Sequence, residues 1–539
     1  MKKMKYGILA LLACSTMTLT GCFNLDEEPF SEITEESFVP SEQDVAALMA
    51  PAYSNLRYIF QWQGYFDTQE EPGDIIITPT RPNGWDDGGT YRRMHQHKWN
   101  SEQWQPWNCY LTPYYGINSA NRVKDQIDRD ELPVGDLKES ILAELRAIRA
   151  LWYSMLLDTH GNVPIVTAFT DEIPTQSTRK ELYDFVVKEL TESLPNLSAE
   201  NSATTYGRMN KWAALATLCR VYLNAEVCTG TAEWAKALDC ANQIINSGLF
   251  ELSADFADNF KASVDYTNKE AIFAVPYDMS YGSFQQQHKW YPPGSQNVFG
   301  NLKNYFWGGS CANPQFINAY EPGDKRLEKT WMMGPQYHFQ TGAELYNCVN
   351  RLPSLTCIRV GEDGKPKDET SVNWGYRVYK YEPDAATING EWSNDFLYFR
   401  YAEILLTKAE CLMRLGQNKD EAARLVSQIR ARVFDDAAQA TVTVADLEAD
   451  TRIQYGTLDW DGNIEEAGDQ TPVYLGGIYD EWGFEFACEA QRRTQMIRFG
   501  TFTTKNWFNH TPQGAHVAIF PIPLEELQAN GNLKQNPGY

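Results

Sequence analysis

A tryptophan in a glycine-rich turn is the first feature of this sequence that could bind a ligand. Trp85 lies in the segment DIIITPTRPNGWDDGGTYRRMHQHKW (74–99), between an Asn-Gly pair and an Asp-Asp-Gly-Gly run. These turn residues show no apolar periodicity, so the sequence does not place the indole on the buried face of a helix or strand. Asp74, Arg81 and Asp86 could hydrogen-bond hydroxyl groups. We therefore predict that these four residues bind a carbohydrate, whose C–H faces are apolar. The alternative is that Trp85 packs under its own loop.

Two later segments repeat this composition. NYFWGGSCAN (304–313) places Tyr305 and Trp307 just before a Gly-Gly pair, and GEWSND (390–395) contains Trp392. We predict that these three aromatic residues also contact a ligand, and packing is the alternative role for each.

Other kinds of site have weaker support. His95 and His97 could be metal ligands on one face of a strand, but the sequence has no third ligand nearby. The segment DWDGN (459–463) lacks the distal glutamate of a calcium loop. There is no G-x-S-x-G, H-E-x-x-H, Walker or dinucleotide-binding motif. We predict no catalytic residue, metal ion or cofactor, although 71 acidic residues leave a glycosidase carboxylate pair open.

The N-terminus has the pattern of an exported lipoprotein. Three lysines precede a short apolar run that ends in Leu19-Thr20-Gly21-Cys22, which resembles a bacterial lipobox. We predict that residues 1–21 are a signal peptide and that Cys22 carries the lipid anchor. Residues 22–43 form an acidic linker, and its run Asp26-Glu27-Glu28 resembles the surface-export signal of Bacteroidota lipoproteins. The expected location is the outer membrane, facing the cell exterior, with the membrane contacted through the lipid only.

Composition excludes some functions and leaves others open. The 539 residues carry a net charge of −24, which becomes −27 once the three lysines of residues 1–21 are removed. Such a chain is a poor partner for nucleic acid, whose binding depends on Lys and Arg. Of the 11 cysteines, nine remain after residues 1–21 and Cys22 are set aside. An odd number cannot all pair, so we predict that most are buried thiols.

Paired amphipathic helices must position the candidate ligand residues. Apolar residues recur with helical periodicity over 208–227 and 233–248, and again over 399–433. Each pair is about as long as one tetratricopeptide unit. Further pairs are predicted for 138–158 with 180–194 and for 44–60 with 107–128, and a last helix for 479–500. The segments 61–106 and 250–395 are predicted to be long loops. The expected fold is mainly α, a tetratricopeptide-like helical-repeat scaffold with long irregular insertions and minor β.

Five segments of the chain resemble the SusD/RagB family of outer-membrane nutrient-binding lipoproteins. They are IRALWYSMLLDTHGNVPIV (148–166), GRMNKWAALATLCRVYLNA (207–225), NDFLYFRYAEILLTKAECLMRLG (394–416), EWGFEFACEAQRRTQMIRFG (481–500) and the C-terminal FPIPLEELQANGNLKQNPGY (520–539). Together with the lipobox they cover essentially the whole mature chain. One departure is CEAQRRTQMIRFG, where relatives often have GHRWFDLRRWG.

The resemblance implies a function and a partner. It implies one SusD-like domain over 44–539, with an N-terminal part (44–250) and a C-terminal part (251–539). It implies a non-enzymatic protein that captures oligosaccharides and delivers them to a SusC-like TonB-dependent barrel, over which it acts as a lid. A peptide-binding lid of the same architecture and a surface glycoside hydrolase are the alternatives.

Overall fold

The computed structural model describes residues 42–539 except 82–84, 133, 279, 281, 285, 301, 304, 352–373, 385–391, 460 and 461. The predicted signal peptide, the anchor Cys22 and nearly all of the acidic linker therefore lie outside the described residues.

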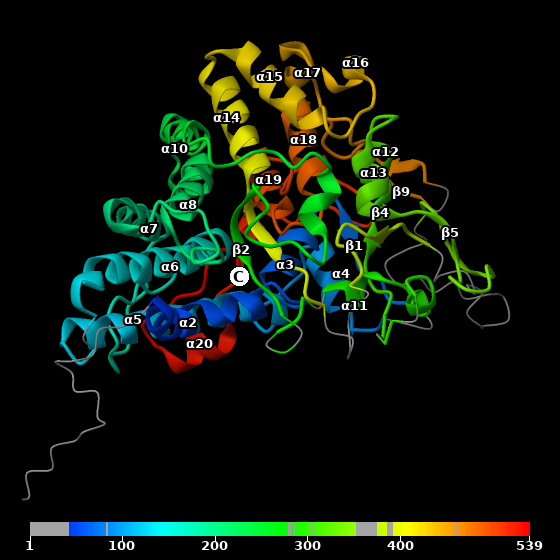
Figure 1. The fold of residues 1–539 in the computed structure, drawn as a ribbon. Helices are drawn as coiled ribbons and strands as arrows, with labels where there is room; N and C mark the ends of the chain where they lie inside the picture. Colours follow the sequence, from blue (N-terminus) through cyan, green and yellow to red (C-terminus); the bar gives the residue numbers. More distant parts are fainter. Residues whose placement is uncertain are drawn as a thin grey trace, which may run out of the picture.

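Four antiparallel helix pairs form the scaffold, as the sequence predicts. The pairs are α2 (Glu42–Ile59) with α5 (Trp104–Asp128), α6 (Lys138–Thr159) with α7 (Arg179–Ser193), α8 (Lys211–Leu223) with α10 (Trp234–Asn246), and α14 (Tyr401–Leu415) with α15 (Lys419–Arg430). Contacts of α5 with α6, and of α10 with α14, join successive pairs (Figure 1). The mainly α fold class is confirmed, because repeated pairing of amphipathic helices buries one continuous apolar core.

Local sequence signals set the ends of these helices. Thr178 and Glu181 form a capping box at the start of α7, which satisfies backbone donors that have no partner within the helix. The side chain of Asn210 accepts hydrogen bonds from two backbone N–H groups at the start of α8. At the end of α14, Gly416 adopts the left-handed conformation (φ 66°), which lets the chain turn directly into α15.

The prediction of a single helix over 479–500 is wrong. The segment forms α18 (Gly476–Phe486) and α19 (Arg492–Arg498), and both Cys488 and Ala490 between them have positive φ angles. The buried carboxylate of Glu70 accepts hydrogen bonds from the backbone N–H groups of Cys488, at 3.3 Å, and Gln491, at 3.1 Å. The break thus exposes backbone donors that a continuous helix would keep for itself, and a distant carboxylate satisfies them.

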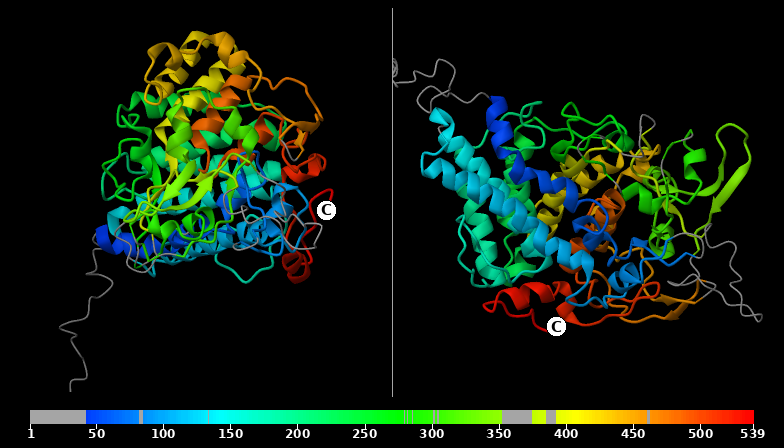
Figure 2. Two further views of the ribbon diagram at one scale, coloured as in Figure 1. Left: turned by 90° about the vertical axis from the view of Figure 1, so that its right-hand side faces the viewer. Right: turned by 90° about the horizontal axis from the view of Figure 1, so that it is seen from below.

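Short antiparallel strand pairs and short helices occur in the described parts of the two predicted loop regions and elsewhere in the described chain. The strand pairs are β1 (Ile76–Ile77) with β3 (Cys311–Ala312), β2 (Ala271–Val275) with β8 (Phe396–Arg400), β4 (Trp331–Met332) with β7 (Arg377–Val378), β5 (Gly334–Tyr337) with β6 (Glu344–Cys348), and β9 (Thr457–Leu458) with β10 (Ile464–Glu466). The further helices are α3 (Tyr65–Glu70), α4 (Thr90–His95), α9 (Ala225–Thr229), α11 (Gln286–Trp290), α12 (Pro314–Asn318), α13 (Lys325–Thr330), α16 (Ala437–Ala440), α17 (Val444–Glu448) and α20 (Leu524–Ala529). The hairpin of β5 and β6 extends from the side of the molecule opposite α5 and α6 (Figures 1 and 2).

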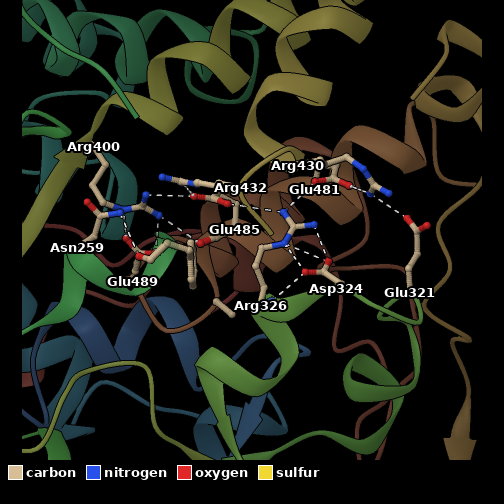
Figure 3. A network of polar contacts seen from close by, with 12 residues as sticks. Asn259, Glu321, Asp324, Arg326, Arg400, Arg430, Arg432, Glu481, Glu485 and Glu489 are labelled. Carbon is tan, nitrogen blue, oxygen red and sulfur yellow. Dashed lines mark hydrogen bonds and ion pairs between the residues drawn. The ribbon is translucent and has the colours of Figure 1, made fainter. Parts of the chain in front are cut away.

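A network of buried ion pairs joins segments that are far apart in the sequence (Figure 3). Glu485 on α18 pairs with Arg400 at the end of β8, at 3.1 Å, and with Arg432 after α15. Arg326 on α13 pairs with Glu481, one turn earlier on α18, at 2.9 Å. The side chains of all five residues are at most 6% exposed. The network ties the last repeat pair to the loop-rich half, and the sequence analysis did not predict it.

The cysteines follow the prediction in the described part of the chain. Eight cysteines are free there, and all except Cys228 are buried. Burial raises the pKa of the Cys109 thiol to about 12 and that of Cys348 to about 11, so these thiols are protonated near neutral pH.

Candidate ligand-binding site

The pairing of β1 with β3 brings two of the predicted ligand loops together. Ile77 lies opposite Cys311 in this pair, so the loop after β1 and the loop before β3 leave the same end of the strands. The hydroxyl oxygens of Thr78 and Ser310, just beyond the paired residues, are 2.7 Å apart. Two segments more than 200 residues apart in sequence therefore form one surface, with Trp85 on the first loop and Trp307 on the second.

Three tryptophans converge at this surface. The ring centroids of Trp85 and Trp307 are 5.8 Å apart, and Trp62, in the turn after α2, lies 5.5 Å from Trp307 and 6.2 Å from Trp85. They line one side of a pocket of about 680 Å³. The complete lining is Trp62, Gln63, Trp85, Asp86, Asp87, Thr90, Arg93, Asn100, Glu102, Gln103, Trp104 and Trp307. The volume lies in the range of small-molecule sites in proteins.

The ring of Trp85 is less exposed than the sequence predicts. Its side chain is 7% exposed, whereas that of Trp307 is 37% exposed. The indole nitrogen of Trp85 donates a 2.6 Å hydrogen bond to Asp87, and the ring lies 5.6 Å from that of Tyr91. A Cβ atom at Gly309 would lie 2.9 Å from the Trp85 ring, so only glycine leaves room for it. Trp85 is thus a supported part of the pocket wall rather than a freely exposed ring.

Buried charges hold the base of this wall in place. Lys289 on α11 is fully buried and pairs with Asp67 at 2.5 Å and with Glu71 at 2.8 Å. Burial alone would lower the pKa of Lys289, but the two carboxylates outweigh it and raise that pKa. The hydroxyl of Tyr91, whose ring contacts Trp85, donates a hydrogen bond to Asp67. The position of Trp85 therefore depends on an ion-pair cluster linked to α3, α4 and α11.

Polar groups surround the tryptophans. Asp86 is exposed at the pocket, and the half-buried Asp87 accepts hydrogen bonds from the backbone N–H groups at the start of α4. Arg93 donates to the side-chain oxygen of Gln103, and Asn100 and Glu102 lie on the loop before α5. The pocket thus presents carboxylates, amides and a guanidinium beside aromatic rings, which can hydrogen-bond hydroxyl groups as donors or acceptors.

Several predicted ligand residues lie elsewhere. Asp74 is fully buried and pairs with Arg492 at 2.6 Å, and Arg81 is 5% exposed and donates to the Trp374 carbonyl oxygen. Trp392 is fully buried in a separate apolar cluster. The structure does not place these residues at the pocket, because their neighbours in the fold cover them. Tyr305 is 84% exposed but does not line the pocket.

Sequence reasoning missed Trp62 and Trp104. Trp62 follows α2 directly, and Trp104 is the first residue of α5 and is 62% exposed. The available signal was composition, since both lie in the aromatic and glycine-rich segment 61–106.

Two other hollows fit a ligand less well. A pocket of about 630 Å³ over 251–269 has no aromatic side chain among its lining residues. A cavity between Leu157, Val221 and Ile497 has room for about 40 Å³, enough for water molecules only. The tryptophan pocket alone among these combines volume, aromatic rings and polar groups.

The predicted histidine pair is part of the core. His95 ends α4 and His97 follows it with φ 53°, so they do not share a strand face. The Nε2 atoms lie 2.6 Å from the Phe508 carbonyl oxygen and 2.8 Å from the Pro72 carbonyl oxygen, respectively. Burial lowers the pKa of His95 to about 4 and that of His97 to about 3.

The low pKa values of these histidines predict that the folded protein loses stability on mild acidification. The pKa of His97 in the folded state lies below its unfolded value of about 6.5, so protons bind preferentially to the unfolded chain. The contribution of His97 to the free energy of unfolding therefore falls by roughly 2 kcal/mol from pH 7 to pH 5. Glu70 and Asp480, whose pKa values burial raises to about 7, act in the opposite direction. Urea unfolding at both pH values should therefore show a smaller acid loss in His97→Phe than in a parallel His516→Phe variant at a half-buried site. If the free energy of unfolding depended equally on pH in both variants, the lowered pKa of His97 would be contradicted.

Comparisons with known proteins agree with this fold. Residues 269–519 match the SusD family, and residues 24–223 match a family described as starch-binding and associating with the outer membrane. The chain is 23% identical to the starch-binding protein SusD of Bacteroides thetaiotaomicron over 98% of both chains.

Solved structures have the same architecture. Surface glycan-binding protein A of Bacteroides uniformis superposes with a TM-score of 0.69 at 18% identity, covering 92% of this chain and 99% of that one. NanU of B. fragilis superposes with a TM-score of 0.70 at 19% identity, covering 95% and 99%. Within the described part of the chain, none of the helices has the length and apolar character needed to cross a bilayer. Two family matches and full-length relatives lead to one conclusion: the chain belongs to the SusD/RagB family.

Proposed function

We propose that this protein is a cell-surface glycan-binding lipoprotein that captures oligosaccharides and delivers them to a SusC-like TonB-dependent transporter, acting as its lid. The observation that carries this proposal is the pocket in which Trp62, Trp85 and Trp307 converge beside carboxylates and amides. Indole rings pack against the apolar faces of sugars, and the polar groups exchange hydrogen bonds with sugar hydroxyls.

The names of the relatives support the ligand class. SusD is described as starch-binding, and the Bacteroides uniformis protein as a surface glycan-binding protein. Starch is itself a glycan, so both names indicate carbohydrate ligands. The loops that carry the tryptophans of this chain are the part that would determine which glycan is bound.

Binding without catalysis is tested with a glycan library. We expect calorimetry to detect binding to at least one oligosaccharide class, and chromatography of the incubated mixture to detect no shorter products. Release of products would contradict a binding-only role and favour a glycoside hydrolase. Binding to peptides but not to glycans would favour the peptide-binding lid instead.

The anchor is tested at Cys22, which lies in the lipobox-like Leu19-Thr20-Gly21-Cys22. The variant Cys22→Ala should leave the chain without acyl groups and release it from the outer membrane, because several acyl chains are needed for stable anchoring. Membrane fractionation is carried out in cells that lack the transporter, so that the partner cannot retain the protein. Continued partition of Cys22→Ala with the membrane would contradict the lipid-anchor assignment.

A further inference from the structure

The charged side chains of the pocket are mostly acidic. Its described lining carries three carboxylates, on Asp86, Asp87 and Glu102, and one cation, Arg93. The local net charge is therefore negative, on a chain whose overall net charge is −24. A pocket with this charge repels an anionic ligand and has no such effect on a neutral one.

The cation in the pocket is already engaged by the protein. Arg93 donates from Nε to the side-chain oxygen of Gln103 at 3.0 Å, and from Nη1 to the carbonyl oxygen of Gly88 at 3.1 Å. These two bonds use two of the five N–H donors of the guanidinium, and Arg93 brings one positive charge against three carboxylates. Arg93 thus holds the loop before α4, and its single charge does not balance the acidic side chains of the pocket.

Two of the three carboxylates of the pocket are exposed. Asp86 and Glu102 are exposed, and neither forms an ion pair with any residue in the described ranges. Ionised carboxylates only accept hydrogen bonds, so they suit the hydroxyl groups of a neutral sugar, which can donate. A uronate or sulfate group has no proton to donate near neutral pH and would bring a like charge.

We infer that this pocket selects uncharged glycans and rejects glycans that carry carboxylate or sulfate groups. The inference rests on the proposed function and adds a ligand class to it. The excess of three acidic side chains over a single arginine carries it, because the tryptophans themselves would accept the apolar face of either kind of sugar.

The test compares three chemical forms of each of four oligosaccharide backbones. Neutral glucan, galactan, mannan and xyloglucan oligosaccharides are each compared with the same material oxidised at C6 to the uronate, and with the methyl ester of that uronate. For the backbone that binds, we expect the uronate to bind about tenfold or more weakly than its ester at low ionic strength. This ratio should shrink near 0.15 M salt, where the Debye length is about 8 Å. The ester controls for the lost C6 hydroxyl, since it lacks both the hydroxyl and the charge.

Two double variants assign the effect to the pocket. D86N/E102Q removes two charges there with little change in shape, and should bring the affinities of uronate and ester to within about threefold of each other. D420N/E448Q removes two charges on α15 and α17 and should leave the ratio as in the wild type. A uronate that binds as well as its ester, or a ratio that D86N/E102Q leaves unchanged, would overturn the inference while the proposed function stands. Failure of every form and every backbone to bind would instead overturn the proposed function, and the inference with it.

Discussion

Replacing Glu485 with Gln should lower the free energy of unfolding by about 3–5 kcal/mol, the range expected when one partner of a buried ion pair is removed. Glu485 is fully buried, and its carboxylate faces Arg432, Arg400 and Arg326 (Figure 3). Burial alone would raise the pKa of Glu485, but these arginines outweigh it and lower that pKa to about 2. The carboxylate is therefore ionised throughout the physiological range, and its loss leaves arginine charges in the interior with fewer partners.

Chemical denaturation of Glu485→Gln and of a matched exposed variant measures this effect. Glu448 pairs with Lys419 at 2.6 Å on the surface, where both side chains are about half exposed. Glu448→Gln should leave the unfolding midpoint nearly unchanged, because exposed ion pairs contribute little. An equally small shift in Glu485→Gln would show that the network does not stabilise the fold.

The second large effect is expected on binding. Trp307→Ala should weaken the affinity for the cognate oligosaccharide about 5- to 150-fold, by analogy with aromatic platforms that contribute roughly 1–3 kcal/mol to base stacking. Trp307 is 37% exposed at the pocket, so the thermal unfolding midpoint of the variant should differ little from that of the wild type. The measurements are a calorimetric titration and a melting curve on the same preparation.

A matched exposed aromatic residue provides the control for this variant. Tyr474 is 63% exposed and lies outside the pocket, so Tyr474→Ala should keep full affinity. Trp85→Ala is a less informative variant than the turn sequence around Trp85 suggests. The ring is packed and only 7% exposed, so its removal should lower stability as well as affinity. Unchanged affinity in Trp307→Ala would move the binding surface away from the three tryptophans.

The helical scaffold could be predicted because its signals are local. The apolar face of α14 repeats every three to four residues, and Gly416 ends the helix, so the sequence shows both the face and the boundary. The break between α18 and α19 could not be predicted in this way. It depends on Glu70, which lies more than 400 residues away and accepts hydrogen bonds from the broken segment.

The candidate site could be predicted in part for the same reason. Turn chemistry identified the loops of Trp85 and Trp307, and the pairing of β1 with β3 joins them. Whether a polar residue in such a loop is exposed depends on distant partners. Asp74 and Asp86 both lie in the segment 61–106 that the sequence predicts to be a loop, yet Arg492, 418 residues from Asp74, makes Asp74 part of the core. The sequence around Asp74 does not indicate that Arg492 is its partner.

The most direct test of the glycan pocket is a crystal structure with the oligosaccharide that the library identifies. We expect a sugar ring packed against the exposed face of Trp307, between Trp62 and Trp104, with hydroxyl groups within hydrogen-bonding distance of Asp86 or Glu102. An oligosaccharide bound elsewhere, with the tryptophan pocket filled by solvent only, would contradict the account.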